Sequence, residues 1–381
     1  MSLASLKLGL YMGKVHPTQA PASIVNAVQQ VTIEYGETAG GQGFSITFRA
    51  DRGSLASQDY ALMSQSLLKP GSRVVITVTL NATPHVLMDG IVSQVQLAPP
   101  EGNQAGTMTV SGKDIGVLLD LVDVNLSLPI PSVTGVVAFV LAKYAPLGLV
   151  PAVIPPIKNV IYAPTERIHF QEGTDLNYLL KLANDNGYIF SIRPGPLPGL
   201  SRAYWGPLIK VGLPQKALTV NMGHSTNVET ISFDYDALKP TQVYGMVADP
   251  DVPIPVPVLG LTNIYPPPLA SQSPFLVNQP FVKKERLTYK GTDAVEAYLQ
   301  SQSRVDQSAD SVVSVQGTLN VPKYGDILRA PGIVGLRGAG KAHDGLYYVK
   351  TVTHTISKGQ YQQQFTLARE GLGSIVSQVS V

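Results

Sequence analysis

The most enzyme-like motif in this sequence is a glycine-rich stretch near its C-terminal end that could bind phosphate groups. Gly335 to Gly340, followed by Lys341, fits the G-x4-G-K part of a phosphate-binding loop. Such a loop needs a Ser or Thr after the lysine to hold magnesium, and a helix must follow so that its N–H groups face the phosphates. Here Ala342 takes the Ser/Thr position and a strand pattern follows. We therefore interpret the motif as a glycine loop that joins two strands.

A pair of carboxylates beside an aromatic side chain could hydrolyse a glycan. Two acids would have to flank a sugar-binding groove, about 5–10 Å apart. Trp205, the single tryptophan, lies beside Tyr204 in an expected Gly/Pro-rich loop, and we interpret this pair as an anchor for the loop on the core or on a partner. Glu370, next to Arg369, is expected to form half of an exposed or interface ion pair. The candidate acids are Glu166, Glu172, Asp175, Glu285, Glu296 and Glu370.

Histidine is the remaining residue type that could bind a metal ion. No two histidines are spaced i, i+4 on an expected helix, although a cluster of His343, Asp344 and His354 across the closing strands is conceivable. There is no G-x-S-x-G motif and no cysteine, so neither a serine nucleophile nor a thiolate site is predicted. We expect no catalytic residues, no metal and no cofactor. The six histidines are His16, His85, His169, His224, His343 and His354.

The composition favours a protein that works in an assembly. A chain of 381 residues predicts two or three domains. Only 14% of the residues are charged, against roughly 25% in ordinary soluble domains. Either much of the surface is buried against partners, since interface cores are depleted in charge, or the surface is rich in Ser, Thr, Gln and Asn. The net charge of +2, without basic clusters, argues against sequence-specific nucleic-acid binding.

No segment has the pattern of a signal peptide or a membrane span. The N-terminal residues lack a basic region ahead of a sustained apolar run. The most apolar region, 133–157, is interrupted by Lys143 and by four prolines, so it is not expected to cross a membrane. The absence of cysteine is compatible with synthesis in a reducing cytoplasm.

Strand patterns dominate both ends of the sequence and predict a barrel or sandwich. The clearest signal is the end of the chain, where a Gly-containing turn separates two runs rich in alternating β-formers and so predicts a long hairpin. A helix is expected over 54–68. The expected strands include 31–35, 44–48, 74–80, 86–97, 108–110, 228–235, 347–356 and 360–368.

Helical patterns lie between the strand blocks. The strongest begins at Thr174, which can cap the helix, and ends at Gly187. The proline-rich stretch 249–280 predicts extended polyproline conformations, and its apolar residues Ile254, Val256, Leu259 and Leu261 indicate that it packs against another surface. Lys283 to Arg286 is expected to be a solvated strand edge. Further helices are expected over 113–121, 133–144 and 292–305.

Several blocks together, in this order and spacing, resemble one family. The sequence is similar to the hub proteins of contractile phage tails, the late control protein D family, which are related to the N-terminal hub part of VgrG-type spike proteins. The resemblance covers about residues 44–374. The blocks are LKPGSRVVI (68–76), VLMDGIVSQVQ (86–96), TMTVSGKDIGVLLDL (107–121), EGTDLNYLLKLANDNGYIFSIRPG (172–195), AYWGP (203–207), VNMGHSTNVETISFDYDALKP (220–240) and the closing hairpin with LAREGLGS (367–374).

The resemblance implies an α+β, mainly β fold with two tube-like antiparallel β-barrel domains and α/β insertions, assembled as a trimeric ring. The implied divisions are residues 1–112 (first barrel), 113–205 (mixed α/β insertion), 206–248 (opening strands of the second barrel), 249–310 (proline-rich segment and helix insertion) and 311–381 (the rest of the second barrel with the closing hairpin). Such a ring would match a sixfold tail tube on one side and a threefold spike on the other.

The resemblance also implies a non-enzymatic role in the baseplate of a phage tail or phage-tail-like particle. The implied partners are two further copies of the chain, a central spike protein, a tail-tube initiator protein and other baseplate proteins, with a tape-measure protein as a candidate occupant of the lumen. Because many relatives continue into a spike whereas this sequence ends at Val381, the spike is expected to be a separate polypeptide. The alternative is a baseplate-associated cell-wall hydrolase or glycan-binding protein that uses Trp205 and nearby acids.

Overall fold

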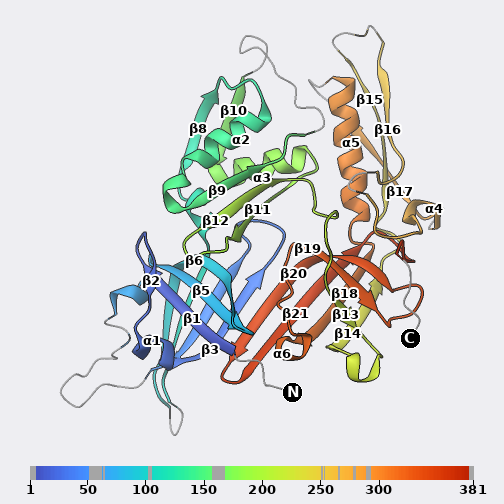
Figure 1. The fold of residues 1–381 in the computed structure, drawn as a ribbon. Helices are drawn as coiled ribbons and strands as arrows, with labels where there is room; N and C mark the ends of the chain where they lie inside the picture. Colours follow the sequence, from blue (N-terminus) through green and yellow to red (C-terminus); the bar gives the residue numbers. More distant parts are fainter. Residues whose placement is uncertain are drawn as a thin grey trace.

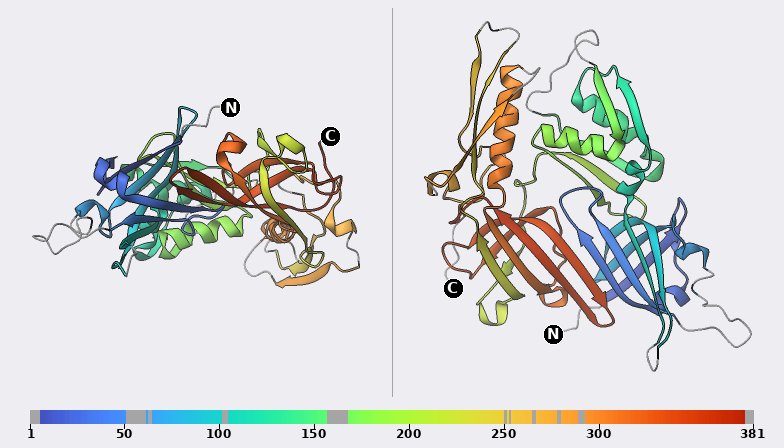
Figure 2. Two further views of the ribbon diagram at one scale, coloured as in Figure 1. Left: turned by 90° about the horizontal axis from the view of Figure 1, so that it is seen from below. Right: turned by 180° about the vertical axis from the view of Figure 1, so that it is seen from behind.

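A computed structural model shows a mainly β chain built around one large sheet, with two smaller units side by side at one end of that sheet (Figures 1 and 2). The structure describes residues 6–50, 62, 65–101, 105–156, 168–249, 252, 254–264, 267–277, 280–288 and 293–376. The mainly β fold class is confirmed.

The large sheet has thirteen strands in the described part of the chain, and these include the first and the last described strands in sequence order. Its main path runs β14-β18-β21-β20-β3-β4-β7-β6-β5-β1-β2, while β19 pairs with β20 and β13 with β19. Its strands are β1 (Leu6–Gly13), β2 (Thr18–Gln19), β3 (Val28–Tyr35), β4 (Gly43–Arg49), β5 (Arg73–Leu80), β6 (Thr83–Ala98), β7 (Thr107–Asp114), β13 (Gln215–Thr219), β14 (Val228–Tyr235), β18 (Val313–Asn320), β19 (Gly332–Arg337), β20 (Gly345–Ser357) and β21 (Gln360–Arg369).

The pairing of β3 with β20 joins what the sequence predicted to be two separate barrels. Six residues of each strand pair antiparallel, from Val352 opposite Tyr35 to Ser357 opposite Gln30. Val31, Ile33 and Val352 are fully buried in one hydrophobic core that extends under both halves of the sheet. The expectation of two closed barrels is therefore wrong for the described residues, which form a single open sheet.

The closing hairpin has the predicted form. In β21 the side chains of Tyr361, Gln363, Phe365 and Leu367 are buried, whereas the residues between them face outward or lie at an intermediate depth up to Thr366. This alternation places one face of the strand on the core. The helix predicted over 54–68 lies largely outside the described residues, which show a short 3-10 helix over Ser66–Leu68. The sheet also carries short helices α1 (Ala22–Ala27) and α6 (Val321–Tyr324) and a 3-10 turn over Gly223–Ser225.

The first smaller unit follows β7 and has a hydrophobic core of its own. The helix predicted over 133–144 is confirmed as α2 (Val133–Ala142), and the helix predicted to begin at Thr174 is confirmed as α3 (Asp175–Asp185). The Thr174 hydroxyl accepts a hydrogen bond from Asn177 N at the start of α3. The helix predicted over 113–121 is only a 3-10 helix, Ile115–Asp120, because Lys113 and Asp114 still belong to β7. The elements are β8 (Asp123–Leu128), α2 (Val133–Ala142), a 3-10 turn (Ala145–Leu147), β9 (Leu149–Val153), β10 (His169–Thr174), α3 (Asp175–Asp185), β11 (Ile189–Pro194) and β12 (Ser201–Gly206).

The second unit packs helix α5 (Ala294–Ala309) on a three-stranded sheet in the order β16-β15-β17. Its other elements are β15 (Thr241–Val247), β16 (Val256–Gly260), α4 (Pro274–Val277) and β17 (Lys283–Thr288). Asp293 caps α5 through Glu296 N, one residue after the predicted start. Part of the stretch predicted to be polyproline is β16, because its backbone pairs with β15. Val256 packs against the small core around Val247 and Val258, whereas Ile254, Leu259 and Leu261 are exposed in the single chain.

A buried ion pair attaches the first unit to the large sheet. The Arg73 Nε and Nη2 atoms donate to the two carboxylate oxygens of Asp89 at 2.8 and 2.6 Å. Arg73 also donates to the carbonyl oxygens of Leu147 (2.9 Å) and Gly199 (3.0 Å) in the first unit, and Ser201 Oγ donates to Asp89 Oδ2 at 3.1 Å. Arg73 is 3% exposed and Asp89 is equally buried. The pair is thus fully desolvated, and each charge depends on the other.

A second buried polar cluster lies at the junction of β3 and β20. His354 Nδ1 is 2.7 Å from the Tyr361 hydroxyl and 3.3 Å from Gln363 Nε2, while Gln363 also exchanges two hydrogen bonds with the backbone of Leu328. Because the amide nitrogen of Gln363 can only donate, Nδ1 acts as the acceptor. Burial, and to a lesser degree the charge of Arg329, lowers the pKa of His354 to about 3. The imidazole is therefore neutral in the folded protein at physiological pH.

Replacing Asp89 with Asn should destabilise the protein by about 3–5 kcal/mol, because the Arg73 charge stays buried without a counter-ion. Urea denaturation of wild type and Asp89→Asn measures the difference. The matched control is Glu285→Gln, whose partner Lys283 is 65% exposed at 3.7 Å and whose loss should cost less than about 1 kcal/mol. Equal effects of the two changes would contradict this account.

Stability should fall on acidification because of His354. In the unfolded chain this histidine has its ordinary pKa of about 6.5, so it binds a proton when the pH falls below that value. In the folded chain its pKa is about 3, so it stays neutral until the pH approaches 3. Wild type should therefore lose about 2 kcal/mol of unfolding free energy between pH 7 and 5 relative to His354→Gln. Denaturation curves at the two pH values test this, and His16→Gln, which alters an exposed side chain, should follow wild type. A pH-independent difference would rule out this role for His354.

Candidate functional site: the polar face of the large sheet

The face of the large sheet opposite its hydrophobic core carries mainly hydroxyl and amide side chains. On the C-terminal half, Thr230, Thr318, Gln364 and Thr353 are successive cross-strand neighbours on β14, β18, β21 and β20. Residues directly opposite each other on paired strands point to the same face. These four side chains are exposed or half-buried. We call this surface the polar face.

The polar face continues across the β3–β20 junction into the N-terminal half. A second row of neighbours runs through Thr355, Thr32, Ser45, Ser111 and Gln94, on β20, β3, β4, β7 and β6. None of these five side chains carries a charge. The polar face therefore spans eight strands of both halves as one surface.

Few charged groups occupy the polar face. Glu34 lies directly opposite Thr353 on β20, and Glu34 and Lys113 both lie directly opposite Gly43 on β4, so these two charges continue the first row across the junction. Within the face, the hydroxyls of Thr230 and Thr318 are 2.7 Å apart and share a hydrogen bond. A shallow hollow of about 370 Å³ lies over β14, β18, β21 and β20. A hydrated surface of this kind, with few charges, exerts little long-range force on a charged polymer that passes it.

The candidate acids do not gather around a groove in the described residues. Glu166 lies outside those residues, Glu172 is exposed on β10, and Glu296 is in the first turn of α5. Glu285 on the edge strand β17 is 3.7 Å from both Lys283 and Arg304, which agrees with the predicted solvated edge. The carboxylate of Asp175 is buried and accepts hydrogen bonds from its neighbours, namely Lys143 Nζ, the Tyr144 hydroxyl and Gln171 Nε2.

The expectation for Glu370 was wrong. Its side chain is 1% exposed, and its carboxylate accepts hydrogen bonds from the backbone N–H groups of Leu269 and Ala270. Its charged partner is Lys210 at 3.4 Å, which also pairs with Asp310 at 2.6 Å. The sequence neighbour Arg369 points elsewhere, with its guanidinium on backbone carbonyl groups. Neighbours along a strand point to opposite faces, which explains the separation.

Trp205 is not available to a ligand. It lies on strand β12 rather than in the predicted loop, and its side chain is 0% exposed. Its indole N–H donates to Leu179 O at 3.3 Å, and its ring meets that of Tyr188 edge to face at 4.9 Å. The interpretation of Trp205 as an anchor on the core is confirmed, and the glycan-binding alternative loses the aromatic platform on which it depended.

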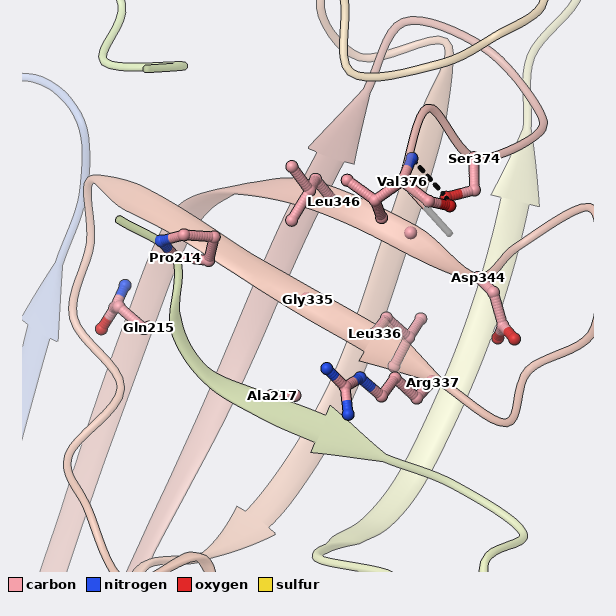
Figure 3. Close-up of a pocket in the computed structure, with 11 residues that line it drawn as sticks. Pro214, Gln215, Ala217, Gly335, Leu336, Arg337, Asp344, Leu346, Ser374 and Val376 are labelled. Atoms are coloured by element: carbon pink, nitrogen blue, oxygen red, sulfur yellow. Dashed lines mark hydrogen bonds between the residues drawn. The ribbon is translucent and has the colours of Figure 1, made fainter. Parts of the chain in front are cut away.

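The glycine-rich motif belongs to a strand and a turn. Gly335 to Arg337 are part of β19, and the following turn leads directly into β20. The Asp344 carboxylate accepts a hydrogen bond from Ala339 N, so an acid occupies the place where a phosphate would have to bind. Figure 3 shows the neighbouring pocket of about 380 Å³, where Arg337 and Asp344 lie near the Ser374–Val376 turn.

The conceivable metal cluster does not form. His343 packs on the ring of Phe233, with ring centroids 4.4 Å apart, whereas His354 lies ten residues further along β20 than Asp344, roughly 30 Å away in an extended strand. In the described ranges no three His, Asp or Glu side chains are placed to hold a metal ion.

Of the other histidines, His16 and His224 are exposed, His85 is half-buried and His169 is buried. None of the described helices is long and apolar enough to span a bilayer.

No protein-family model and no curated protein matches the sequence. Solved structures do match the fold over nearly its full length. A tail protein from Neisseria meningitidis MC58 and the 43 kDa tail protein of prophage MuSo2 from Shewanella oneidensis are each 12% identical with a TM-score of 0.64. Each match covers 96% of this chain. It covers 98% of the Neisseria protein and 99% of the Shewanella protein.

A third similar structure is the E. coli c3393 protein, described as a component of the type VI secretion system with structural similarity to the bacteriophage T4 tail proteins gp27 and gp5. It is 12% identical with a TM-score of 0.56, and the match covers 99% of this chain and 80% of that protein. The chain therefore has the fold of phage tail proteins and of a type VI secretion component, and the resemblance of its sequence to the baseplate hub family is confirmed at the level of fold.

Proposed function

We propose that this chain is a structural baseplate hub of a contractile tail or injection particle. In this role it forms a homotrimeric adapter between a sixfold tail tube and a threefold central spike. Its fold likeness to tail proteins over nearly the whole chain supports a tail structural role. No step of the role requires catalysis.

The observation that carries the trimer proposal is the open large sheet, whose terminal strands include β14 and β1. Strand β14 ends the main path on one side, and β1 on the other side is covered by the β2 segment at Leu10, Tyr11 and Met12. Unpaired strand edges tend to recruit another strand. Pairing of β14 in one copy with β1 in the next is a heterologous contact, and such contacts close into a ring when the rotation allows it.

Three copies would place six groups of strands around the ring. Each copy contributes two groups of strands, β1–β7 and β13, β14 with β18–β21, joined at β3 and β20. The division into 1–112, 113–205, 206–248, 249–310 and 311–381 remains our proposal, supported by the separate hydrophobic cores of the two smaller units. Six sheet segments in a trimer would match a sixfold tube above and a threefold spike below.

In this ring the polar face would line the lumen and continue the channel of the tail tube. A wall of Ser, Thr and Gln stays hydrated and does not hold a passing chain by charge. The two smaller units would then contact the spike, the tube initiator and other baseplate proteins, with a tape-measure protein as a candidate occupant of the lumen. The location of the hub would be the baseplate.

The solution mass of the purified chain tests the trimer. Light scattering after size exclusion should give about three times the chain mass of 40.6 kDa. The double variant Thr230→Lys, Ser232→Lys should dissociate toward monomer, because lysines on edge strand β14 discourage edge pairing. A monomeric wild type at every accessible concentration would contradict self-assembly of the isolated chain.

The matched control is the double variant Gln316→Lys, Thr318→Lys. These residues are the direct cross-strand neighbours of Ser232 and Thr230 on β18, so the control adds the same charge to the same face one strand further in. It should remain a trimer. Loss of the trimer in both variants would show that charge on the polar face, and not the edge, controls assembly.

A further inference from the structure

A largely buried arginine without a counter-ion lies at the base of the first unit. The Arg193 Nε and Nη2 atoms, on β11, are buried and have no hydrogen-bond partner among the described residues. Its guanidinium carbon is 5.4 Å from the centre of the Tyr204 ring. Burial lowers the pKa of Arg193, the neighbouring Tyr348, Tyr35 and Tyr204 partly oppose that shift, and the charge of Arg202, its cross-strand neighbour on β12, adds a smaller lowering.

This arrangement contrasts with the other buried arginine that attaches the first unit to the sheet. Arg73 has the Asp89 carboxylate within 2.6 Å and uses its remaining N–H groups on carbonyl oxygens. An unpaired buried charge costs folding free energy, and a charge that only supports the fold is normally compensated. Arg193 is partly exposed as a whole residue, but its buried Nε and Nη2 atoms lack that compensation among the described residues.

A pocket of about 320 Å³ borders Arg193. A second cation, Arg329, also lines it, and none of its lining residues is acidic. Arg329 Nη2 is 2.7 Å from His85 Nδ1. Burial, and then the charge of Arg329, lowers the pKa of His85, so the partner of Arg329 is a neutral imidazole at neutral pH. Two positive charges thus face one cavity with no negative charge on its walls.

Most of the other lining residues are apolar and come from segments far apart in the sequence, while Tyr35, Gln215 and His354 add uncharged polar groups. Val86 and Leu87 belong to β6, Ile209 and Val211 to the linker that follows the first unit, and Ile333 to β19. The volume is at the lower end of the range for small-molecule sites, which are mostly apolar with a few placed polar groups. A bare inorganic anion would leave these apolar walls uncovered.

We propose that this cavity, the Arg193 pocket, binds a carboxylate that is attached to a small apolar group. The flat guanidinium fork of arginine matches the two oxygens of a carboxylate, and the apolar walls would cover the hydrocarbon part. The carboxylate would come either from a free small acid or from the end of a peptide chain. Bound there, it would neutralise Arg193 and connect the first unit to the linker and to β19.

Calorimetric titration of the full chain with hexanoate tests the proposal. Wild type should bind with a dissociation constant on the order of 1 mM, and the uncharged analogue hexanamide should bind at least about tenfold more weakly. Arg193→Met should lose at least about tenfold in hexanoate affinity. The control Arg202→Met, which removes a nearby exposed charge outside the pocket, should stay within about threefold of wild type.

A thermal melt of the ligand-free proteins separates a binding role from a structural one. Arg193→Met should melt at the same temperature as wild type or higher, because it removes an uncompensated buried charge. If this variant does not fold, Arg329→Gln, a change at an exposed side chain, should lower the affinity for hexanoate by at least about threefold. Equal binding of hexanoate and hexanamide, or unchanged binding by the folded Arg193 and Arg329 variants, would overturn the proposal.

Two dipeptides identify the source of the carboxylate. Acetyl-Ala-Leu with a free carboxyl end should bind more tightly than hexanoate if the natural ligand is a chain terminus, and more weakly if it is a free acid. The same dipeptide with an amidated end should not bind in either case. Binding of the amide as strongly as the acid would contradict recognition through the carboxylate. The result does not depend on the oligomeric state, so it stands apart from the test of the trimer.

Discussion

The pairing of β3 with β20 is the constraint on which the rest of the structure depends. It brings together the first and last thirds of the chain, and every strand of the large sheet follows from it on one side or the other. Without it, each half would have an additional free edge and part of the common core would be exposed. Contacts between such distant residues are slow to form because the loop between them must close first. The closing hairpin, which is a local structure, supplies a preformed surface for this step.

The sequence predicted the parts of the fold that local chemistry determines. The cap at Thr174, the glycine turn of the closing hairpin and the alternation along β21 all arise within a few residues, and the structure has each of them. The β3–β20 pairing was missed because no local signal specifies which strand lies beside which. The same reason explains β16, which contains Pro257 and lies in a proline-rich stretch that predicted polyproline, whereas its backbone pairs with β15.

The candidate site shows the same division. Alternating Thr, Ser and Gln could be seen in single strands, but the polar face exists only because the register aligns those residues across eight strands. The ion pair expected for Glu370 does form, but it is buried, and its partner Lys210 is 160 residues away along the chain. Arg193 carried no sequence signal at all, because the lack of a counter-ion is a property of its surroundings in space.

The low charge content of the chain gains a physical explanation from where the charges are. Arg73, Asp89, Lys210, Arg369 and Glu370 are all buried, so several of the few charged residues hold elements together and do not cover the surface. The exposed surface therefore contains two kinds of region, one uncharged and polar and the other apolar. Uncharged polar groups dominate the free face of the large sheet, whereas exposed apolar side chains such as Phe139, Phe170, Tyr244, Met246 and Leu259 lie on the two smaller units. A polymer passing the polar face of the large sheet would bind it only weakly. Protein partners would gain binding energy by burying the exposed apolar side chains of the two smaller units. The fold therefore keeps its apolar and its uncharged polar surfaces on different elements, an arrangement that the proposed role as an adapter would need.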